Sequence, residues 1–230
     1  MRIILFANGH CPYPHSARAH IRPDDFILCA DGGASHALAL GLTPDLVIGD
    51  MDSLDADTVA ALRAAGSEIR VYPQDKDDTD LELALLAARD LHPEAVILLG
   101  ALGGRLDQML GNVLLLARPE FAALNITLMA GTERAWVVRD EIIVHGQPGD
   151  TLSVLALTPE VTGLTYHFGL RWPLQRAILR LGDSRGISNE LTANDARITL
   201  ESGLLLVIHA TSDQDFSEEL LRTQRHQGTK

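Results

Sequence analysis

The sequence predicts an α/β fold, with an N-terminal parallel-sheet (Rossmann-like) domain followed by a C-terminal antiparallel β-sandwich. Three observations lead to this prediction. Short apolar runs alternate with helical patterns up to about residue 131. Helical periodicity then stops, and short β-rich stretches separated by turn residues take its place. The chain of 230 residues is 46% hydrophobic, which is ample for packed cores.

The first domain alternates strands with helices. Its apolar runs have the length of buried strands and lie at residues 3–7, 26–30, 46–48, 69–72, 95–99 and 126–129. Helical patterns lie between most of them, at residues 34–40, 54–65, 81–91 and 106–118. Ser53 is a suitable cap for the second helix, and Thr79 or Asp80 for the third. Such alternation indicates a parallel sheet, whose ligands bind beyond the carboxyl ends of the strands.

The second domain contains short β-rich stretches and no helical pattern. They lie at residues 135–138, 142–145, 152–157, 177–181 and 204–209. Turn segments rich in glycine, proline and aspartate separate them, which is typical of a small antiparallel sandwich or barrel. We therefore expect a first domain at 1–131, a second at 132–212, and a loose polar tail at 213–230.

Charge and cysteine content restrict the class of protein. Lys and Arg number 19 against 31 Asp and Glu, and the net charge of -12 argues against nucleic acid or an anionic membrane as partner. No apolar segment approaches the length that spans a bilayer, and the run at 3–7 is too short for a secretion signal. The two cysteines, Cys11 and Cys29, suit reduced thiols. We expect a cytoplasmic protein with no nucleic-acid and no membrane partner.

Acidic residues follow two consecutive predicted strands. Asp50 and Asp52 come after the strand at 46–48, and Lys76-Asp77-Asp78-Thr79-Asp80 comes after the strand at 69–72. Carboxylates gathered at neighbouring strand ends repel one another unless a cation joins them. Mg²⁺ is usually shared between a few carboxylates and the phosphates of a nucleotide. The pair at Asp50 and Asp52 therefore predicts metal ligation and phosphate chemistry, in preference to a solvated acidic loop.

The second acidic segment has two interpretations. It is equally explained as an ordinary charged loop with a helix cap, but Lys76 beside the acids is suited to phosphate oxygens. Which of its three acids points inward stays open at this level.

Two glycine-rich segments also follow predicted strands and open helices. Asp31-Gly32-Gly33-Ala34 frees the backbone to approach an anion, although a plain tight turn explains it as well. Residues 100–108 contain Arg105, whose guanidinium fits phosphate, and a further acid, Asp107. This segment lacks the Gly-Lys-Ser/Thr ending of a Walker A loop. We prefer phosphate contact here to a turn with a salt bridge.

Three other segments carry weaker signals. His10, Cys11, His15 and His20 fit no common zinc spacing, and we expect a flexible surface loop there. Residues 169–174 and 186–190 offer an aromatic face and small polar side chains, which composition alone assigns to packing and turns.

Together these segments resemble the thiamine pyrophosphokinase family, bacterial type. Each segment is weak by itself, but six in the right order are specific, and the match covers residues from about 3 to 209. The matching segments are Ala30-Asp31-Gly32-Gly33-Ala34, Gly49-Asp50-Met51-Asp52-Ser53, Lys76-Asp77-Asp78-Thr79-Asp80, Gly100-Ala101-Leu102-Gly103-Gly104-Arg105-Leu106-Asp107, Gly169-Leu170-Arg171-Trp172-Pro173-Leu174 and Gly186-Ile187-Ser188-Asn189-Glu190.

The resemblance implies transfer of a diphosphate group from ATP to the hydroxyl of thiamine, giving thiamine diphosphate and AMP. It also implies a homodimer with its sites at the subunit interface, a catalytic first domain and a thiamine-binding, dimerising second domain. By the same resemblance Asp50, Asp52 and Asp80 are the Mg²⁺ ligands, and Asp31 and Asp107 line the same site. We count Asp50, Asp52, Asp80 and Asp107 as the catalytic residues, and our own hypothesis for the reaction is that Asp107 or Asp80 accepts the hydroxyl proton. The expected ATP-binding residues are Asp31, Gly32, Lys76, Asp77, Thr79 and Arg105, and the expected thiamine-binding residues are Ser188, Asn189 and Trp172.

The chain departs from the family pattern at two positions. Trp172 stands where many members have Tyr, so it either stacks on thiamine or packs in the core. Gln108 stands where His is frequent, which argues against proton transfer at that position.

Two rival functions follow from the same residues. One is a pyrophosphokinase that acts on another alcohol, such as a hydroxymethyl pterin. The other is a non-catalytic regulator that binds a nucleotide or thiamine. A regulator is expected to have lost a metal-binding acid, and none of the matched acids is missing.

Overall fold

The computed structural model describes residues 1–11 and 14–211 of the chain. Its contacts divide it into two compact units, the first Met1–Gly131 and the second beginning at Thr132. The predicted tail at 213–230 lies outside the described residues.

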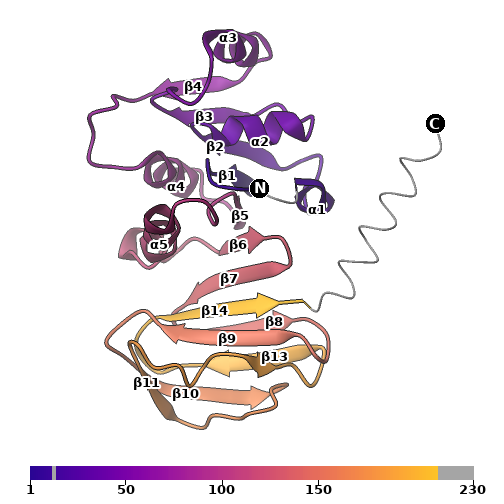
Figure 1. Cartoon of the computed structure of the whole chain (residues 1–230), viewed down its shortest axis with the longest axis vertical. Helices are drawn as coiled ribbons and strands as arrows, with labels where there is room; N and C mark the ends of the chain where they lie inside the picture. The colour runs from indigo at the N-terminus through magenta and orange to yellow at the C-terminus, as the bar shows by residue number, and fades with distance from the viewer. Residues whose placement is uncertain (12–13, 212–230) are drawn as a thin grey trace, which may run out of the picture. The chain divides into compact units, whose positions relative to one another are not determined.

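The first unit is built on six parallel strands in the order β6-β5-β1-β2-β3-β4 (Figure 1). The chain runs outward from β1 to β4 and returns on the other side of β1 with β5. Ligands of such sheets bind where the strand order reverses, here at the carboxyl ends of β1 and β5. The strands are β1 (Arg2–Phe6), β2 (Phe26–Ala30), β3 (Leu46–Gly49), β4 (Glu68–Val71), β5 (Ala95–Leu99) and β6 (Ile126–Ala130).

Five α-helices and one 3₁₀ helix connect these strands in the described part of the chain. They are α1 (Pro14–Ala19), α2 (Gly33–Ala39), α3 (Ala56–Ala64), α4 (Asp80–Asp90), α5 (Leu106–Leu115) and η1 (Pro119–Phe121). Both α2 and α4 pack on β2, and the central strands β1, β2 and β3 are almost entirely buried.

Two local expectations need correction. The segment expected to be a flexible loop contains α1, because Ala17 and Ile21 are buried in the core of this unit and hold the segment there. Residues 12 and 13 of that segment lie outside the described residues. The cap of α3 is Asp55, not Ser53: the Asp55 side chain accepts from Thr58 N at 2.7 Å. The predicted cap of α4 is confirmed, since Thr79 accepts from Glu82 N at 3.2 Å.

The second unit is a sandwich of two antiparallel sheets. Within it the strand orders are β12-β9-β14-β7 and β11-β10-β13-β8. Its core contains side chains from both sheets, among them Val154, Val207, Leu164 and Ile198. The strands are β7 (Glu133–Val138), β8 (Glu141–His145), β9 (Thr151–Ala156), β10 (Glu160–Phe168), β11 (Ala177–Arg180), β12 (Asn189–Glu190), β13 (Asp195–Thr199) and β14 (Leu205–Ala210).

The predicted fold class is therefore confirmed. Among the described residues, none of the helices combines the length and apolar character needed to cross a membrane.

Candidate active site

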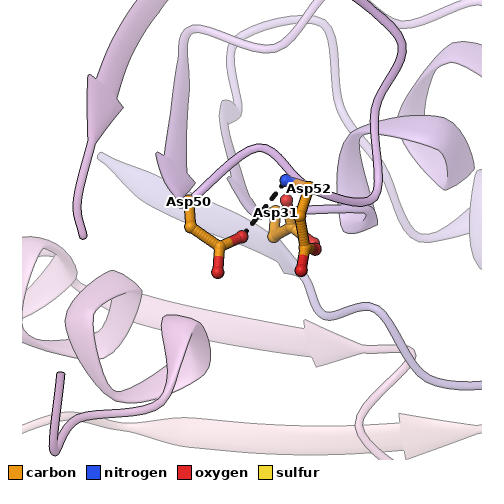
Figure 2. Close-up of side chains that lie close together, drawn as sticks. All are labelled: Asp31, Asp50 and Asp52. Carbon is orange, nitrogen blue, oxygen red and sulfur yellow. Dashed lines mark hydrogen bonds between the residues drawn. The ribbon is translucent and has the colours of Figure 1, made fainter. Parts of the chain in front are cut away.

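Three acidic side chains meet at the carboxyl ends of β2 and β3. Each of Asp31, Asp50 and Asp52 offers a carboxylate oxygen, and these oxygens all lie within 4.8 Å of one another (Figure 2). Asp31 is only 3% exposed, and its Oδ1 has no hydrogen-bond partner among the described residues. A buried carboxylate oxygen without a partner is costly. The cluster is thus an unbalanced group of negative charges whose oxygens are available to a cation.

The loop after β3 holds the acids in place. Met51 has a φ of 64°, and the chain turns back so that Asp52 N donates to Asp50 Oδ1 at 3.1 Å (Figure 2). The Asp52 carboxylate accepts from Ser53 Oγ at 3.1 Å and from Gln74 Nε2 at 3.0 Å. One oxygen of Asp50 and both oxygens of Asp52 are therefore oriented by neighbouring donors.

A fourth acid, Asp80, lies beside the cluster at the start of α4. Lys76 Nζ lies 3.0 Å from Asp80 Oδ1 and 3.9 Å from Asp50 Oδ2, so Lys76 joins the two acidic segments. A Cβ at Gly49 would lie 2.8 Å from Asp31 Cβ and 3.2 Å from Asp80 Cγ, so both acids lie close to the bare glycine backbone. Burial raises the pKa of Asp80, and the nearby charges of Asp50 and Asp31 add to that effect, while Lys76 opposes it.

A cavity of about 600 Å³ opens at the point where the strand order reverses. Its lining includes Asn8 and Gly9 after β1, Asp31 after β2, Thr79 and Asp80 at the start of α4, and Asp107 and Asn112 of α5. Its volume lies within the range of small-molecule sites.

Several polar residues of this region were not predicted, among them Asn112 and Arg118 in the cavity lining. Asn8 lines the cavity and donates from Nδ2 to Ser53 Oγ at 3.0 Å, and Gln74 donates to Asp52. The signal for Asn8 was its position, since Asn8-Gly9 directly follows the first strand at the binding edge of the sheet. Gln74 offers no such signal, because it lies in the middle of a loop.

Arg105 and Asp77, two of the predicted ATP-binding residues, are exposed and lie in different loops. Arg105 is 70% exposed and makes a two-pronged ion pair with Asp107, through Nε to Oδ1 at 3.2 Å and through an η nitrogen to Oδ2 at 2.6 Å. These hydrogen bonds lower the pKa of Asp107. Asp77 is exposed in the loop that contains Lys76. In the described residues, then, Arg105 pairs with Asp107 and not with the acid cluster.

Gly32 and its neighbour Gly33 are required by packing. A Cβ at Gly32 would lie 2.3 Å from Asn8 Oδ1, and one at Gly33 would lie 2.1 Å from the backbone oxygen of Phe6. The two glycines therefore let α2 begin directly against β1, which brings Asp31 to the cavity.

The predicted thiamine-binding residues gather in the second unit. Ser188, Asn189 and Trp172 line a separate pocket of about 360 Å³, together with Tyr166 and Arg185. Trp172 is 54% exposed, so it is not a core residue. The guanidinium carbon of Arg171 lies 5.1 Å from the Trp172 ring centroid, a cation–π distance.

Comparison with known proteins gives one consistent family. The model described as "Thiamin pyrophosphokinase, catalytic domain" matches residues 18–128. The model described as "Thiamin pyrophosphokinase, vitamin B1 binding domain" matches residues 140–205.

Relatives with this name are similar over most of their length. Thiamine pyrophosphokinase 1 of Arabidopsis thaliana is 30% identical, over 76% of this chain and 73% of its own. Thiamine pyrophosphokinase of Bacillus subtilis is 28% identical, over 79% of this chain and 85% of its own. The crystal structure of a thiamin pyrophosphokinase family protein from Enterococcus faecalis has a TM-score of 0.80 at 29% identity, covering 92% of this chain and 100% of that one.

Proposed function

Because the chain belongs to the thiamine pyrophosphokinase family, we propose that it transfers the diphosphate group of ATP to the hydroxyl of thiamine, giving thiamine diphosphate and AMP. The observation that carries this proposal is the carboxylate cluster of Asp31, Asp50 and Asp52, of which Asp31 also lines the cavity where the sheet order reverses. That is the chemistry a metal–polyphosphate complex requires. The family match extends over both units, including the vitamin B1 binding domain. We therefore propose thiamine as the diphosphate acceptor on the same family evidence as ATP as the donor.

The acid cluster fits Mg²⁺. Its donors are all carboxylate oxygens, which are hard ligands, and one of them, Asp31 Oδ1, is buried without a partner among the described residues. We assign the ion to Asp50 and Asp52 together with Asp31, and to Asp80, which also lies close to Gly49. When bound, Mg²⁺ neutralises polyphosphate charge and stabilises the charge that develops on the leaving group.

The other predicted site residues of the first unit are assigned to ATP. Thr79 lines the cavity, and we assign Lys76 and Arg105 as cations for phosphate oxygens, with Asp77 in the same loop as Lys76. Arg118 also lines the cavity and is a further cation for them. The thiamine hydroxyl must lose its proton as it attacks phosphorus. The two candidate acceptors are Asp80 and Asp107, which both line the cavity.

We place thiamine in the pocket of the second unit. Trp172 offers an exposed aromatic face, which suits both the flat pyrimidine and the positive charge of the thiazolium ring. Ser188 lies at the rim of this pocket, with a φ of 61° and with its N–H donating to Ser153 Oγ at 3.0 Å.

We also propose that the enzyme is a homodimer with its sites at the subunit interface. The support is an apolar stripe on α5: Leu106, Leu110 and Leu114 recur at a spacing of four residues and are 64%, 52% and 55% exposed. None of the residues of α5 is buried. A second copy that covers this stripe removes it from water.

Sedimentation velocity tests the dimer. Leu110→Glu is expected to give a monomer, because it places a charge at the centre of the stripe. Leu38→Glu, at a leucine of α2 that is 41% exposed, is the matched control and should stay dimeric. A Leu110→Glu protein that sediments as the wild type does would refute this interface.

A cytoplasmic location completes the proposal. The chain has only two cysteines, Cys11 and the buried Cys29, and so small a number suits a reducing compartment.

The reaction is tested by incubation with ATP, Mg²⁺ and thiamine. AMP and thiamine diphosphate should appear together, and ADP with thiamine monophosphate would refute diphosphate transfer. A hydroxymethyl pterin, offered as the competing acceptor, should not be used. Asp52→Asn should nearly abolish AMP formation with the fold intact, whereas Asp57→Asn, an exposed acid in the first turn of α3, should not.

A further inference from the structure

Two segments of the second unit pair beside the thiamine pocket. Residues 169–172 follow β10, and residues 189–192 include β12. They are joined by an antiparallel bridge between Leu170 and Leu191 and by bonds of 3.0 Å from Thr192 N to Gly169 O and from Arg171 N to Glu190 O. One residue further along this register, Trp172 lies opposite Asn189.

At this position the side-chain amide of Asn189, and not its backbone, pairs with the backbone of Trp172. Trp172 N donates to Asn189 Oδ1 at 3.1 Å, and Asn189 Nδ2 donates to Trp172 O at 2.8 Å. A primary amide carries the same donor and acceptor as a peptide group, so it can form both bonds of a strand pair. The backbone of Asn189 is meanwhile paired with Leu152 of β9. Asn189 thereby connects β9 to Trp172.

These bonds leave the amide of Asn189 little capacity for a ligand. Its Oδ1 accepts a second bond, from Glu190 N at 2.8 Å, so both acceptor positions are filled and one of two N–H donors is used. The residue is only 7% exposed. The Trp172 ring, in contrast, is 54% exposed at the pocket, with Arg171 over it.

We propose that Asn189 is a positioning residue: its amide holds the backbone of Trp172 so that the ring is fixed in the pocket before thiamine arrives. This inference rests on the proposed function and replaces the direct contact that the family resemblance implies for Asn189. A ring that is already held loses less freedom when the ligand binds. Release of the ring is expected to raise the KM for thiamine about two- to tenfold and to leave kcat within twofold.

A double-mutant cycle separates positioning from contact. Asn189→Ala alone should raise the KM for thiamine, as should Trp172→Ala alone. If Asn189 acts through the ring, adding Asn189→Ala to Trp172→Ala raises KM no further. Multiplication of the two effects would show that Asn189 touches thiamine and would overturn the inference, as would an unchanged KM in Asn189→Ala.

Fluorescence tests the positioning without turnover. The chain has two tryptophans, so Trp136→Phe leaves Trp172 as the sole emitter. In that background Asn189→Ala should lower the fluorescence anisotropy of Trp172 and increase its quenching by acrylamide. Unchanged anisotropy and quenching would overturn the inference even if the enzyme makes thiamine diphosphate. An inactive wild type that shows the expected loosening would instead overturn the proposed function.

A second variant covers the case in which Asn189→Ala does not fold. Asn189→Asp keeps the shape and the acceptor oxygen but loses the donor to Trp172 O. It should also loosen Trp172, and a rigid ring in this variant would count against the inference.

Discussion

The acid cluster predicts that repulsion among its carboxylates destabilises the folded protein when no metal is bound. Asp31→Asn should remove part of this repulsion and so stabilise the metal-free protein. Asn has the shape of Asp and tolerates the left-handed backbone at this position, where φ is 44°. The carboxylate oxygens of Asp31, Asp50 and Asp52 lie within 4.8 Å of one another. At an effective dielectric constant of 20, two unit charges at that distance repel by about 3.5 kcal/mol.

The net gain is smaller than this pairwise figure. Asp52 is exposed, so solvent screens its charge, and Lys76 lies 3.9 Å from Asp50 and offsets part of the repulsion. We therefore expect Asp31→Asn to raise the free energy of unfolding by about 1–2 kcal/mol without metal. Mg²⁺ at 100 times its dissociation constant should stabilise the wild type by about 2.7 kcal/mol, and the variant should lose that gain.

Addition of Mg²⁺ should consequently reverse which of the two proteins, wild type or Asp31→Asn, has the larger free energy of unfolding. Urea unfolding in EDTA should show the variant as the more stable protein, and unfolding in saturating MgCl₂ should show the wild type as the more stable. Asp57→Asn makes the same change in net charge on α3 and should keep the full response to Mg²⁺. A variant that is weaker than the wild type in EDTA, or that responds to Mg²⁺ as the wild type does, would refute this reasoning.

Three further predictions concern stability. Arg2 donates to the buried Asp25 at 2.8 and 2.6 Å, so Arg2→Met should cost about 3 kcal/mol at pH 7 in urea unfolding. Burial opposes ionisation of Asp25, but hydrogen bonds led by Arg2 outweigh it and lower its pKa. This contribution is therefore present above the unfolded pKa of about 3.9 and lost as the pH falls through the lower folded pKa, and an equal cost at pH 2 would contradict it. Tyr166→Phe removes a buried hydroxyl that has no partner among the described residues, so thermal unfolding should show a gain of up to about 1 kcal/mol; a clear loss would argue against this. Gly33→Ala should cost about 2–3 kcal/mol, because its methyl group would lie 2.1 Å from a carbonyl oxygen of β1, while Gly111→Ala in α5, with open space around it, should gain about 1 kcal/mol.

The first unit was the easier one to predict because its strands, apart from the exposed edge strand β4, are buried and apolar. Buried parallel strands appear as continuous hydrophobic runs, and all six strands were found with every end within one residue. In the second unit β10, β12 and β13 were missed. The strand β10 contains Gly163 and irregular pairing, β12 has two residues, and β13 buries only Ala196 and Ile198. Such strands depend on their partners more than on their own pattern.

The sequence was enough to predict which segments meet at the acid cluster, but not which of their atoms come together. The strand-end rule placed Asp50, Asp52 and Asp31 at one edge of the sheet, but which oxygens meet depends on the turn at Met51 and on Gly49. The hydrogen bonds between the Asn189 amide and the backbone of Trp172 could not be predicted from the sequence. They follow from the register of two segments that are separated in sequence.

Gly49 also determines how this site can be lost in evolution. Any side chain at that position must displace Asp31, whose Cβ would lie 2.8 Å from the new one, and would also crowd Asp80, whose Cγ would lie 3.2 Å away. A single substitution at position 49 can thus disable the site while every acid remains in the sequence. A descendant of this chain that has kept all its aspartates but not this glycine is expected to have drifted away from phosphate chemistry, and a survey of acids alone would miss it.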